Sequence, residues 1–223
     1  MPGKAPTRWV RRFTRSEIAV HWALAATVLA MIATGIALGV NMWHGVAFPV
    51  HVASVFVLAA GIVVTAIVGD PAALSRAGGQ LSRIERDDRR WLGWAPQHLL
   101  GGGGDPPPVG RFNGGQKLNA ILIATLLGAS TASGIWWWAR LHGLVSNSNV
   151  DGAVHNVAGV AIIVLVCGHL YMAVLNPGTR HALRGITTGR VDAEWAAQHH
   201  PAWPAEAQPE GPTRAVREPP RAP

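Results

Sequence analysis

The sequence predicts an all-α integral membrane protein, a bundle of four transmembrane helices with both termini in the cytoplasm. Four apolar segments, at about 18–40, 48–69, 116–138 and 154–175, are each long enough to cross a bilayer. Only 14% of the residues are charged, and charges avoid the interiors of these segments. With four spans, every Lys and Arg except Arg140 falls on one side of the membrane, and the positive-inside rule makes that side cytoplasmic.

The first span follows a basic N-terminal segment, residues 1–17. The uncharged run Ile18–Val40 is longer than the apolar core of a signal peptide, and no clear small-residue cleavage site follows it. We therefore expect a retained signal anchor in a bacterial inner membrane. Gly35 and Gly39 form a small-xxx-small pair suited to close contact with a neighbouring helix.

The second span, at about 48–69, is expected to open at Pro49, because proline is favoured in the first turn of a helix. Asp70-Pro71 then stops it. The middle segment 70–114 is rich in arginine, glycine and proline and lacks a regular long periodicity. It predicts short helical turns at most, on the cytoplasmic side.

The third and fourth spans are joined by a short connection that holds Arg140. The third ends at Trp136, Trp137 and Trp138, a cluster typical of the interfacial aromatic belt. After the fourth span, the C-terminal segment 176–223 is basic and then rich in Pro and Ala, a composition that predicts disorder beyond about residue 206.

The net charge of +7 could indicate binding to nucleic acid. However, the chain carries no nucleic-acid motif, and its basic residues flank apolar spans. The charge therefore predicts orientation in a lipid bilayer rather than a nucleic-acid partner.

Two histidines in the fourth span are the strongest sign of function. His155 and His169 are fourteen residues apart, which is about 21 Å along a helix, and they return to roughly the same face. An imidazole in hydrocarbon is costly, so it indicates a functional site by default.

The predicted topology sorts four histidines into two pairs by depth. His21 and His169 lie near the cytoplasmic surface, and His51 and His155 lie near the outer surface. Such pairs predict two haems with bis-histidine ligation, which suits electron transfer because no coordination position stays open. A single membrane histidine is often only an interhelical hydrogen-bonding residue, but four that match in depth favour ligation.

The assignment in the second span has an alternative, since His44 precedes His51 by seven residues. If Pro49 opens the span, His44 remains in the loop. The other histidines fall in polar segments and are expected to be solvated or interfacial: His98, His142, His181, His199 and His200.

The chain has one cysteine, Cys167, and therefore no CxxCH motif and no cysteine cluster for iron–sulfur or zinc. Any haem must be non-covalent and of the b type.

A second candidate site is the segment GRFNGGQK, residues 110–117, at the cytoplasmic entry of the third span. Its glycines expose backbone N–H groups, Asn113 and Gln116 offer amides, and Lys117 offers a charge. These groups could hydrogen-bond a quinone carbonyl or a haem propionate. The alternative is a glycine-rich loop followed by an interfacial lysine anchor.

Taken together, these segments resemble the gamma subunit, a cytochrome b, of membrane-bound formate dehydrogenase. The resemblance rests on His21-Trp22, on GRFNGGQK, and on the spacing of His155 and His169 before Tyr171-Met172. It also rests on the segment from Arg184 to Trp203, which contains RGITTGR and WAAQHHPAW, and it covers most of residues 14–203.

The resemblance implies an electron-conducting membrane anchor. A molybdenum- or tungsten-containing catalytic (alpha) subunit would oxidise formate, and an iron–sulfur (beta) subunit would pass the electrons to two b haems. His51 and His155 would ligate the outer haem, and His21 and His169 the inner haem.

The resemblance also implies an acceptor site next to the inner haem. Asn113 and Gly115 match the family's quinone loop, with Gln116 and Lys117 as neighbours, and the acceptor would be menaquinone or ubiquinone. The chain itself has no residue set for a molybdenum site, so we expect a non-catalytic electron-transfer subunit that carries the site of quinone reduction.

Two alternatives remain at this point. One is the cytochrome b subunit of a hydrogenase or of another molybdoenzyme. The other, of a different class, is a haem-free membrane anchor or a small transporter that uses histidines for protons or metal ions.

Overall fold

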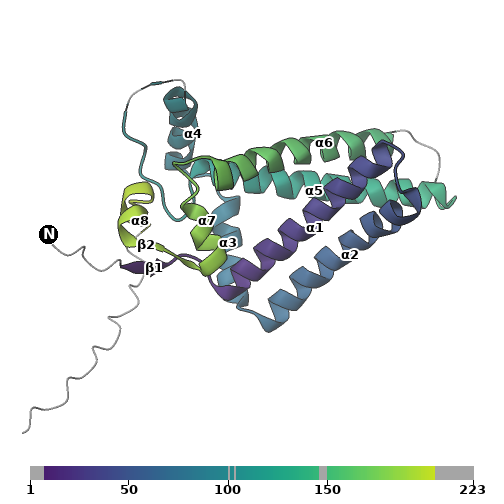
Figure 1. The fold of residues 1–223 in the computed structure, drawn as a ribbon, viewed down its shortest axis with the longest axis horizontal. Helices are drawn as coiled ribbons and strands as arrows, with labels where there is room; N and C mark the ends of the chain where they lie inside the picture. Colours follow the sequence, from purple (N-terminus) through teal and green to yellow (C-terminus); the bar gives the residue numbers. More distant parts are fainter. Residues whose placement is uncertain (1–7, 100, 103, 146–149, 204–223) are drawn as a thin grey trace, which may run out of the picture.

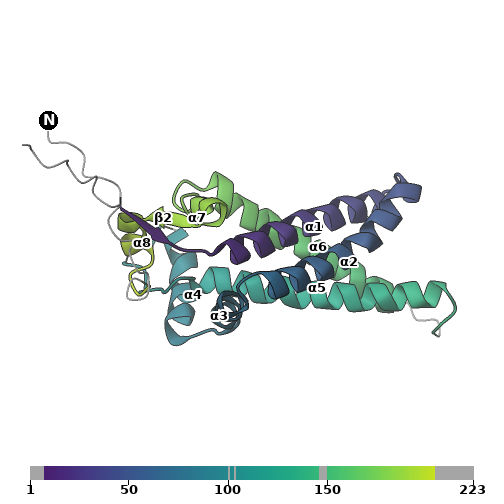
Figure 2. The ribbon, with the colours of Figure 1, turned by 90° about the horizontal axis from the view of Figure 1, so that it is seen from below.

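Four long helices make up most of the molecule. The computed structural model describes residues 8–99, 101–102, 104–145 and 150–203. Two helical hairpins run side by side along its length (Figures 1 and 2), formed by α1 (Arg15–Gly39), α2 (His44–Val68), α5 (Gly114–Leu141) and α6 (Val150–Leu170), with the π-helix η1 (Tyr171–Leu175) continuing α6. All four are long and apolar enough to cross a membrane, which confirms the predicted fold class. The expected disordered tail beyond residue 206 lies outside the described residues.

Side chains fix the starts of two of these helices. The hydroxyl of Thr14 accepts a hydrogen bond from the backbone N–H of Glu17, and the Glu17 carboxylate accepts one from the backbone N–H of Thr14. Asn113 and Gln116 form the same reciprocal pair at the start of α5. Each box satisfies backbone donors that a helix start otherwise leaves unpaired.

The second span begins earlier than the proline predicts. α2 starts at His44, and Pro49 stands inside it, in its second turn. Trp43, the residue before it, has a positive φ of 50° and reverses the chain direction between α1 and α2. The expectation that Pro49 opens the helix and leaves His44 in a loop is therefore wrong.

The middle segment is also more regular than predicted. It folds into two helices, α3 (Pro71–Ser82) and α4 (Arg86–Leu99), instead of short turns. Asp70 both ends the second span and caps α3, since its carboxylate accepts from the N–H of Ala73. α4 contains Gly93 and Pro96, which are poor helix formers, so packing against α5 must supply much of its stability.

A small folded unit, here called the cap, covers one end of the bundle (Figure 1). It contains the antiparallel pair β1 (Trp9–Arg11) and β2 (Arg190–Asp192), with α7 (Ala182–Thr188) before β2 and α8 (Ala193–His199) after it. Its apolar core consists of Val10, Val191, Ala196 and Trp203. The sequence reading assigned no structure to this part of the chain.

Three segments that are distant in the sequence meet in the cap. The N–H groups of Arg12 and Phe13 donate to the carbonyl of Gly189. Nδ1 of His200 donates to the carbonyl of Gly110 at 2.8 Å, and the N–H of Ala202 donates to the carbonyl of Val109. Residues 12–13, the middle segment and the C-terminal segment are thus joined at the same end of the bundle.

The cap encloses two ionisable side chains, Arg12 and His200, that sequence reasoning would place in solvent. Arg12 is 3% exposed, and its guanidinium lies 5.4 to 5.9 Å from the ring centres of Phe13, Trp195 and Trp203. Burial, followed by the charge of Arg111, lowers the pKa of Arg12 to about 10. His200 is also 3% exposed, so the expectation that it is solvated or interfacial is wrong.

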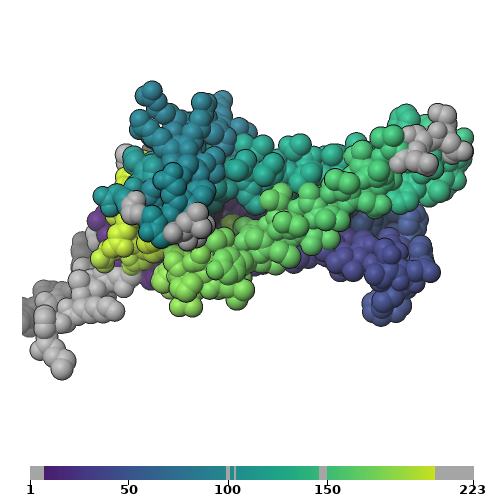
Figure 3. Space-filling model, turned by 90° about the horizontal axis from the view of Figure 1, so that it is seen from above, coloured from purple at the N-terminus to yellow at the C-terminus, as the bar shows by residue number. Residues whose placement is uncertain are grey.

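Buried ion pairs tie the helix ends together. Arg111 contacts Glu17 at 2.6 Å, and Lys117 contacts Asp88 of α4 at 2.6 Å. Arg140 and Asp151 form a third pair, at 3.0 Å, where the chain passes from α5 to α6 at the opposite end. Figure 3 shows α6 along one face of the bundle, with α4 rising beside it at the cap end.

The cap should lose stability as the pH falls. Burial, followed by the charge of Arg12, lowers the pKa of His200 from 6.5 to about 4. Protonation therefore favours the open cap, and stability that is complete above pH 6.5 is lost progressively down to about pH 4. One pKa unit corresponds to about 1.4 kcal/mol, so the full loss is about 3 kcal/mol.

This loss can be followed by amide hydrogen exchange of residues 190–203 between pH 7 and pH 4, after correction for intrinsic exchange rates. His200→Gln, which cannot be protonated, should flatten the pH dependence. Equal protection at both ends of this range in the wild-type chain would contradict the prediction.

Candidate functional site

The structure brings together both predicted histidine pairs. The ring centres of His21 on α1 and His169 on α6 are 6.3 Å apart. Those of His51 on α2 and His155 on α6 are 6.0 Å apart. His21 and His169 lie in the half of the bundle next to the cap, and the other pair lies in the opposite half. α6 therefore contributes one histidine to each pair.

These separations fit a metal ion between two imidazoles. If each ring nitrogen binds the ion at about 2.0–2.1 Å, the two ring centres lie roughly 6.3 Å apart. Among the described residues, no three His, Cys, Asp or Glu side chains gather into a metal-binding group. Two facing imidazoles, with no further protein donor among the described residues, would suit a macrocycle that supplies four nitrogens of its own.

Hydrogen bonds orient His155 for such a role. Its Nδ1 lies 2.8 Å from the carbonyl oxygen of Ser130 on α5. A carbonyl only accepts, so Nδ1 carries the proton and Nε2 keeps its lone pair. On α5, Gly134 makes room for the ring, because a Cβ there would lie 3.1 Å from both Nδ1 and Cε1 of His155. The indole of Trp137 meets the same ring edge-to-face, with centres 5.9 Å apart.

His51 is oriented in the same way by α1. Its Nδ1 lies 2.9 Å from the hydroxyl oxygen of Thr34. That hydroxyl donates its single proton to the carbonyl of Ala30 at 2.7 Å, so it accepts from Nδ1–H of His51. Nε2 of His51 is therefore also the unprotonated nitrogen. Sequence reasoning missed Thr34 and Ser130, since the sequence does not show which polar residues of neighbouring helices face a histidine.

The first pair is held next to the cap. Trp22 follows His21 directly, and its indole N–H donates to the carbonyl of Ile186 in α7 at 3.0 Å. The rings of His21 and Trp22 meet edge-to-face, with centres 5.6 Å apart. In the HW dipeptide, His21 therefore faces α6 while Trp22, the next residue, anchors α1 to the cap.

The side chains of the loop 110–117 have structural partners. Asn113 and Gln116 use their side-chain oxygens in the capping box of α5, and Lys117 is buried against Asp88 rather than exposed as an interfacial anchor. The capping box at the start of α5 engages Oδ1 of Asn113 and leaves its Nδ2 group as a donor. A Cβ on Gly115 would lie 2.7 Å from the ring of Trp91, so this glycine permits close packing against α4.

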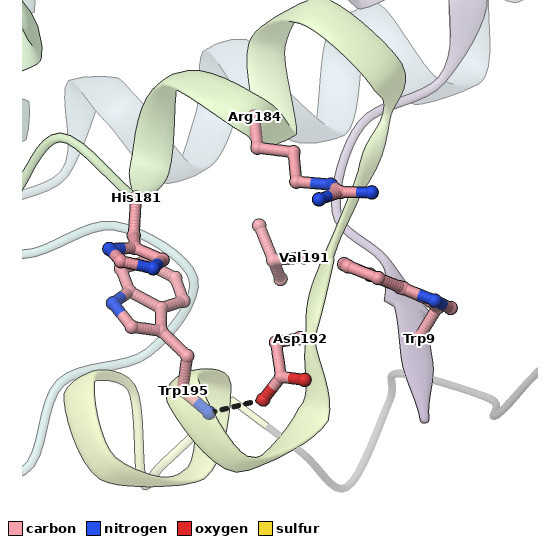
Figure 4. Close-up of a pocket in the computed structure, with 6 residues that line it drawn as sticks. All are labelled: Trp9, His181, Arg184, Val191, Asp192 and Trp195. Atoms are coloured by element: carbon pink, nitrogen blue, oxygen red, sulfur yellow. Dashed lines mark hydrogen bonds between the residues drawn. The ribbon is translucent and has the colours of Figure 1, made fainter. Parts of the chain in front are cut away.

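A separate small pocket of about 210 Å³ lies in the cap (Figure 4). Trp9 of β1 and Trp195 of α8 line it, together with His181, Arg184, Val191 and Asp192. The guanidinium of Arg184 lies 3.9 Å from the ring centre of Trp9, and Asp192 caps α8 by accepting from the N–H of Trp195. None of these residues belongs to the histidine pairs or to the loop 110–117.

Comparison with known proteins points to a cytochrome b. The family model of prokaryotic cytochrome b561 matches residues 12–189, which include all four paired histidines. The chain is 27% identical over 127 residues to the cytochrome b556(Fdn) subunit of the nitrate-inducible formate dehydrogenase of Escherichia coli K12, covering 56% of this chain and 57% of the relative. It is 32% identical over 106 residues to the cytochrome b556(fdo) subunit of formate dehydrogenase from the same strain, covering 45% and 47%. The chain thus matches about half the length of these curated relatives.

Thr34→Val should weaken the site at His51 and His155. The change keeps the side-chain shape but leaves Nδ1–H of His51 without its acceptor. Loss of such a hydrogen-bond partner of a metal ligand typically lowers metal affinity by about 10- to 100-fold. The measurement is haem retained per chain during purification. Thr65→Val in α2, where the hydroxyl bonds only to the carbonyl of Gly61, is the matched control. Equal retention in the two variants would contradict the role of Thr34.

Proposed function

Because the chain belongs to the prokaryotic cytochrome b561 family, we propose that it is the membrane-anchoring cytochrome b subunit of a formate dehydrogenase complex. In this role it carries electrons from an iron–sulfur subunit through two b haems to quinone. The observation that carries the proposal is the spacing of the two imidazole pairs, 6.3 and 6.0 Å between ring centres.

His51 and His155 would hold the outer haem, and His21 and His169 the inner haem. Each haem would supply reversible one-electron chemistry between its two histidines. Thr34 and the backbone of Ser130 would act on the outer ligands by keeping the proton on Nδ1, so that Nε2 keeps its lone pair for the iron. Gly134 lets the ring of His155 lie directly against α5.

Formate as the electron source is supported by the two Escherichia coli relatives, both named as formate dehydrogenase subunits. The chain would assemble with an iron–sulfur beta subunit and a molybdenum- or tungsten-containing alpha subunit. The iron–sulfur subunit would meet the bundle at the end away from the cap, next to His51 and His155.

The quinone would bind at the cap end, at the loop that contains Asn113, Gly115, Gln116 and Lys117. Nδ2 of Asn113 is a donor suited to a quinone carbonyl, since the capping box engages only the oxygen of this amide. Reduction of the quinone to the quinol takes two electrons and two protons. With both termini and the cap in the cytoplasm, the protons would come from that side.

Single-ligand variants test the haem assignment. His51→Ala and His155→Ala should remove the same haem, and His21→Ala and His169→Ala the other, so that the haem content of the chain falls to about half in each case. Reduced-minus-oxidised spectra of membranes and haem-to-protein ratios measure this.

His44→Ala is the control and should retain both haems, because the ring that faces His155 belongs to His51. A wild-type chain without a b-type spectrum would favour a haem-free anchor or transporter. Loss of the outer haem in His44→Ala, with its retention in His51→Ala, would refute the ligand assigned on α2.

Substitutions at Asn113 separate its two roles. Asn113→Asp keeps an oxygen acceptor for the helix cap and removes the Nδ2 donor, so quinone reduction should slow by roughly tenfold while α5 stays intact. Asn113→Ser keeps a side-chain oxygen that caps α5 and can donate a hydrogen bond through its hydroxyl. The rate of quinone reduction should therefore fall less in this variant than in Asn113→Asp. The rate of haem reoxidation by added quinone, at unchanged haem content, is the measurement. Loss of haem in the Asp variant would instead make Asn113 structural.

A further inference from the structure

Helix α4 lies across the cap end of the bundle. Its axis runs transverse to the four long helices, and in Figure 1 it projects beyond their edge (Figures 1 and 2). It is fixed to the start of α5, where the third membrane span begins. Lys117 and Asp88 form their buried ion pair there at 2.6 Å, and a Cβ on Gly114 would lie only 2.5 Å from the carbonyl oxygen of Asp88. α4 is therefore held at the level at which the chain enters the membrane.

The two faces of α4 differ in chemistry. Asp88 and Trp91 lie on the face that packs directly on the start of α5. At about 100° per residue, Arg86, Arg89 and Arg90 fall within roughly 100° of one another on the opposite face. All three arginines are exposed. A helix in this position that presents a row of cations is typical of the membrane–water interface.

The positive charge of this face is only partly compensated. Arg90 contacts Asp87 at 3.2 Å, but both side chains are more than half exposed, at 61% and 51%. Within the part of the chain that the structure describes, Arg86 and Arg89 have no acidic partner. Two guanidinium groups are therefore left for an external anion, and their planar set of donors matches the oxygens of a phosphate.

The flank of α4 is aromatic. Trp91 and Trp94 are half-buried, with ring centres 6.3 Å apart. The indole N–H of Trp94 donates to the carbonyl of Gly104, which ties the following segment to this flank. Tryptophan is enriched where a protein passes through the headgroup layer, so these rings place α4 at the same depth as its contact with α5 does.

We propose that α4 lies in the headgroup layer of the bilayer and that Arg86, Arg89 and Arg90 bind the phosphates of anionic phospholipids. A bilayer is the partner because the spans that carry α4 cross one, so the arginine face stays at its surface. Each arginine near an anionic surface corresponds to roughly fivefold in affinity. Neither the haems nor the quinone enters this inference.

The test uses the full chain, reconstituted in phosphatidylcholine vesicles and labelled with bimane at a single cysteine. Cys167→Ala removes the one native cysteine. Gly93→Cys then places the label in the middle of the arginine face, where an added Cβ meets nothing within 4 Å. The probe lipids are phosphatidylglycerol and phosphatidylcholine, each with a nitroxide near the top of one acyl chain, and the measurement is quenching of the label.

Gln198→Cys is the matched control for the label. Gln198 is exposed on α8, which lies at the end of the cap away from the bundle (Figure 1). Both lipids should quench the label at Gly93→Cys strongly and the label at Gln198→Cys weakly.

Phosphatidylglycerol should quench the label at Gly93→Cys at a roughly twentyfold lower mole fraction than phosphatidylcholine, because Arg86 and Arg89 each contribute about fivefold. Changing Arg86, Arg89 and Arg90 together to Gln should bring the two lipids within about twofold of each other. Sodium chloride at about 1 M should do the same to the wild-type arginines by screening. Inorganic phosphate should act no more strongly than chloride at equal ionic strength, since the site takes a lipid phosphate.

Two results would overturn the proposal directly. Quenching at Gly93→Cys no stronger than at Gln198→Cys would place the arginine face in water, where it would suit an acidic protein instead. Equal quenching by the two lipids would place α4 on the membrane but refute the anionic-lipid site.

Amide hydrogen exchange of Arg86–Leu99 shows whether α4 stays folded in the triple variant. If it does not, the effect of salt on the chain with all three arginines decides, and a preference for phosphatidylglycerol that salt leaves unchanged would refute the site.

Discussion

The arrangement of the four long helices depends on the cost of leaving an imidazole unpaired in hydrocarbon. Neighbouring helices meet that cost on α2 and α6. The hydroxyl of Thr34 accepts a hydrogen bond from Nδ1–H of His51, and the carbonyl of Ser130 accepts one from Nδ1–H of His155. The same hydrogen bonds determine the tautomer and leave the lone pair on Nε2. The contacts that satisfy these imidazoles in the apolar bundle therefore also determine which ring nitrogen keeps a lone pair.

Each histidine pair also bridges the two hairpins. α1 packs against α2, and α5 packs against α6, whereas both pairs join a helix of the first hairpin to α6. The spans bury little of their own surface, with 6–11% of their most apolar windows covered by the chain. A group held between the histidines would therefore contribute to the joint between the hairpins, and lipid or partner subunits would cover the remaining apolar faces.

The sequence was sufficient for the spans and for the pairing of histidines, because both follow from simple constraints. Bilayer thickness determines segment length, and the charge bias gives direction, so depth alone matches His21 with His169 and His51 with His155. The sequence was insufficient where stability comes from contacts across the chain. α4 depends on Asp88 meeting Lys117, β1 depends on a strand that follows all four spans, and His200 is buried only because the cap closes over it.

The pairing of β1 with β2 has a consequence for the order of assembly. Val10 lies opposite Val191, so this sheet cannot form until the last span has been synthesised and its C-terminal segment has returned to the N-terminus. Closing a loop of this length is entropically unfavourable, and helical hairpins with local contacts form first. The end of the bundle next to His21 and His169 thus receives its β-sheet only after all four long helices have been synthesised.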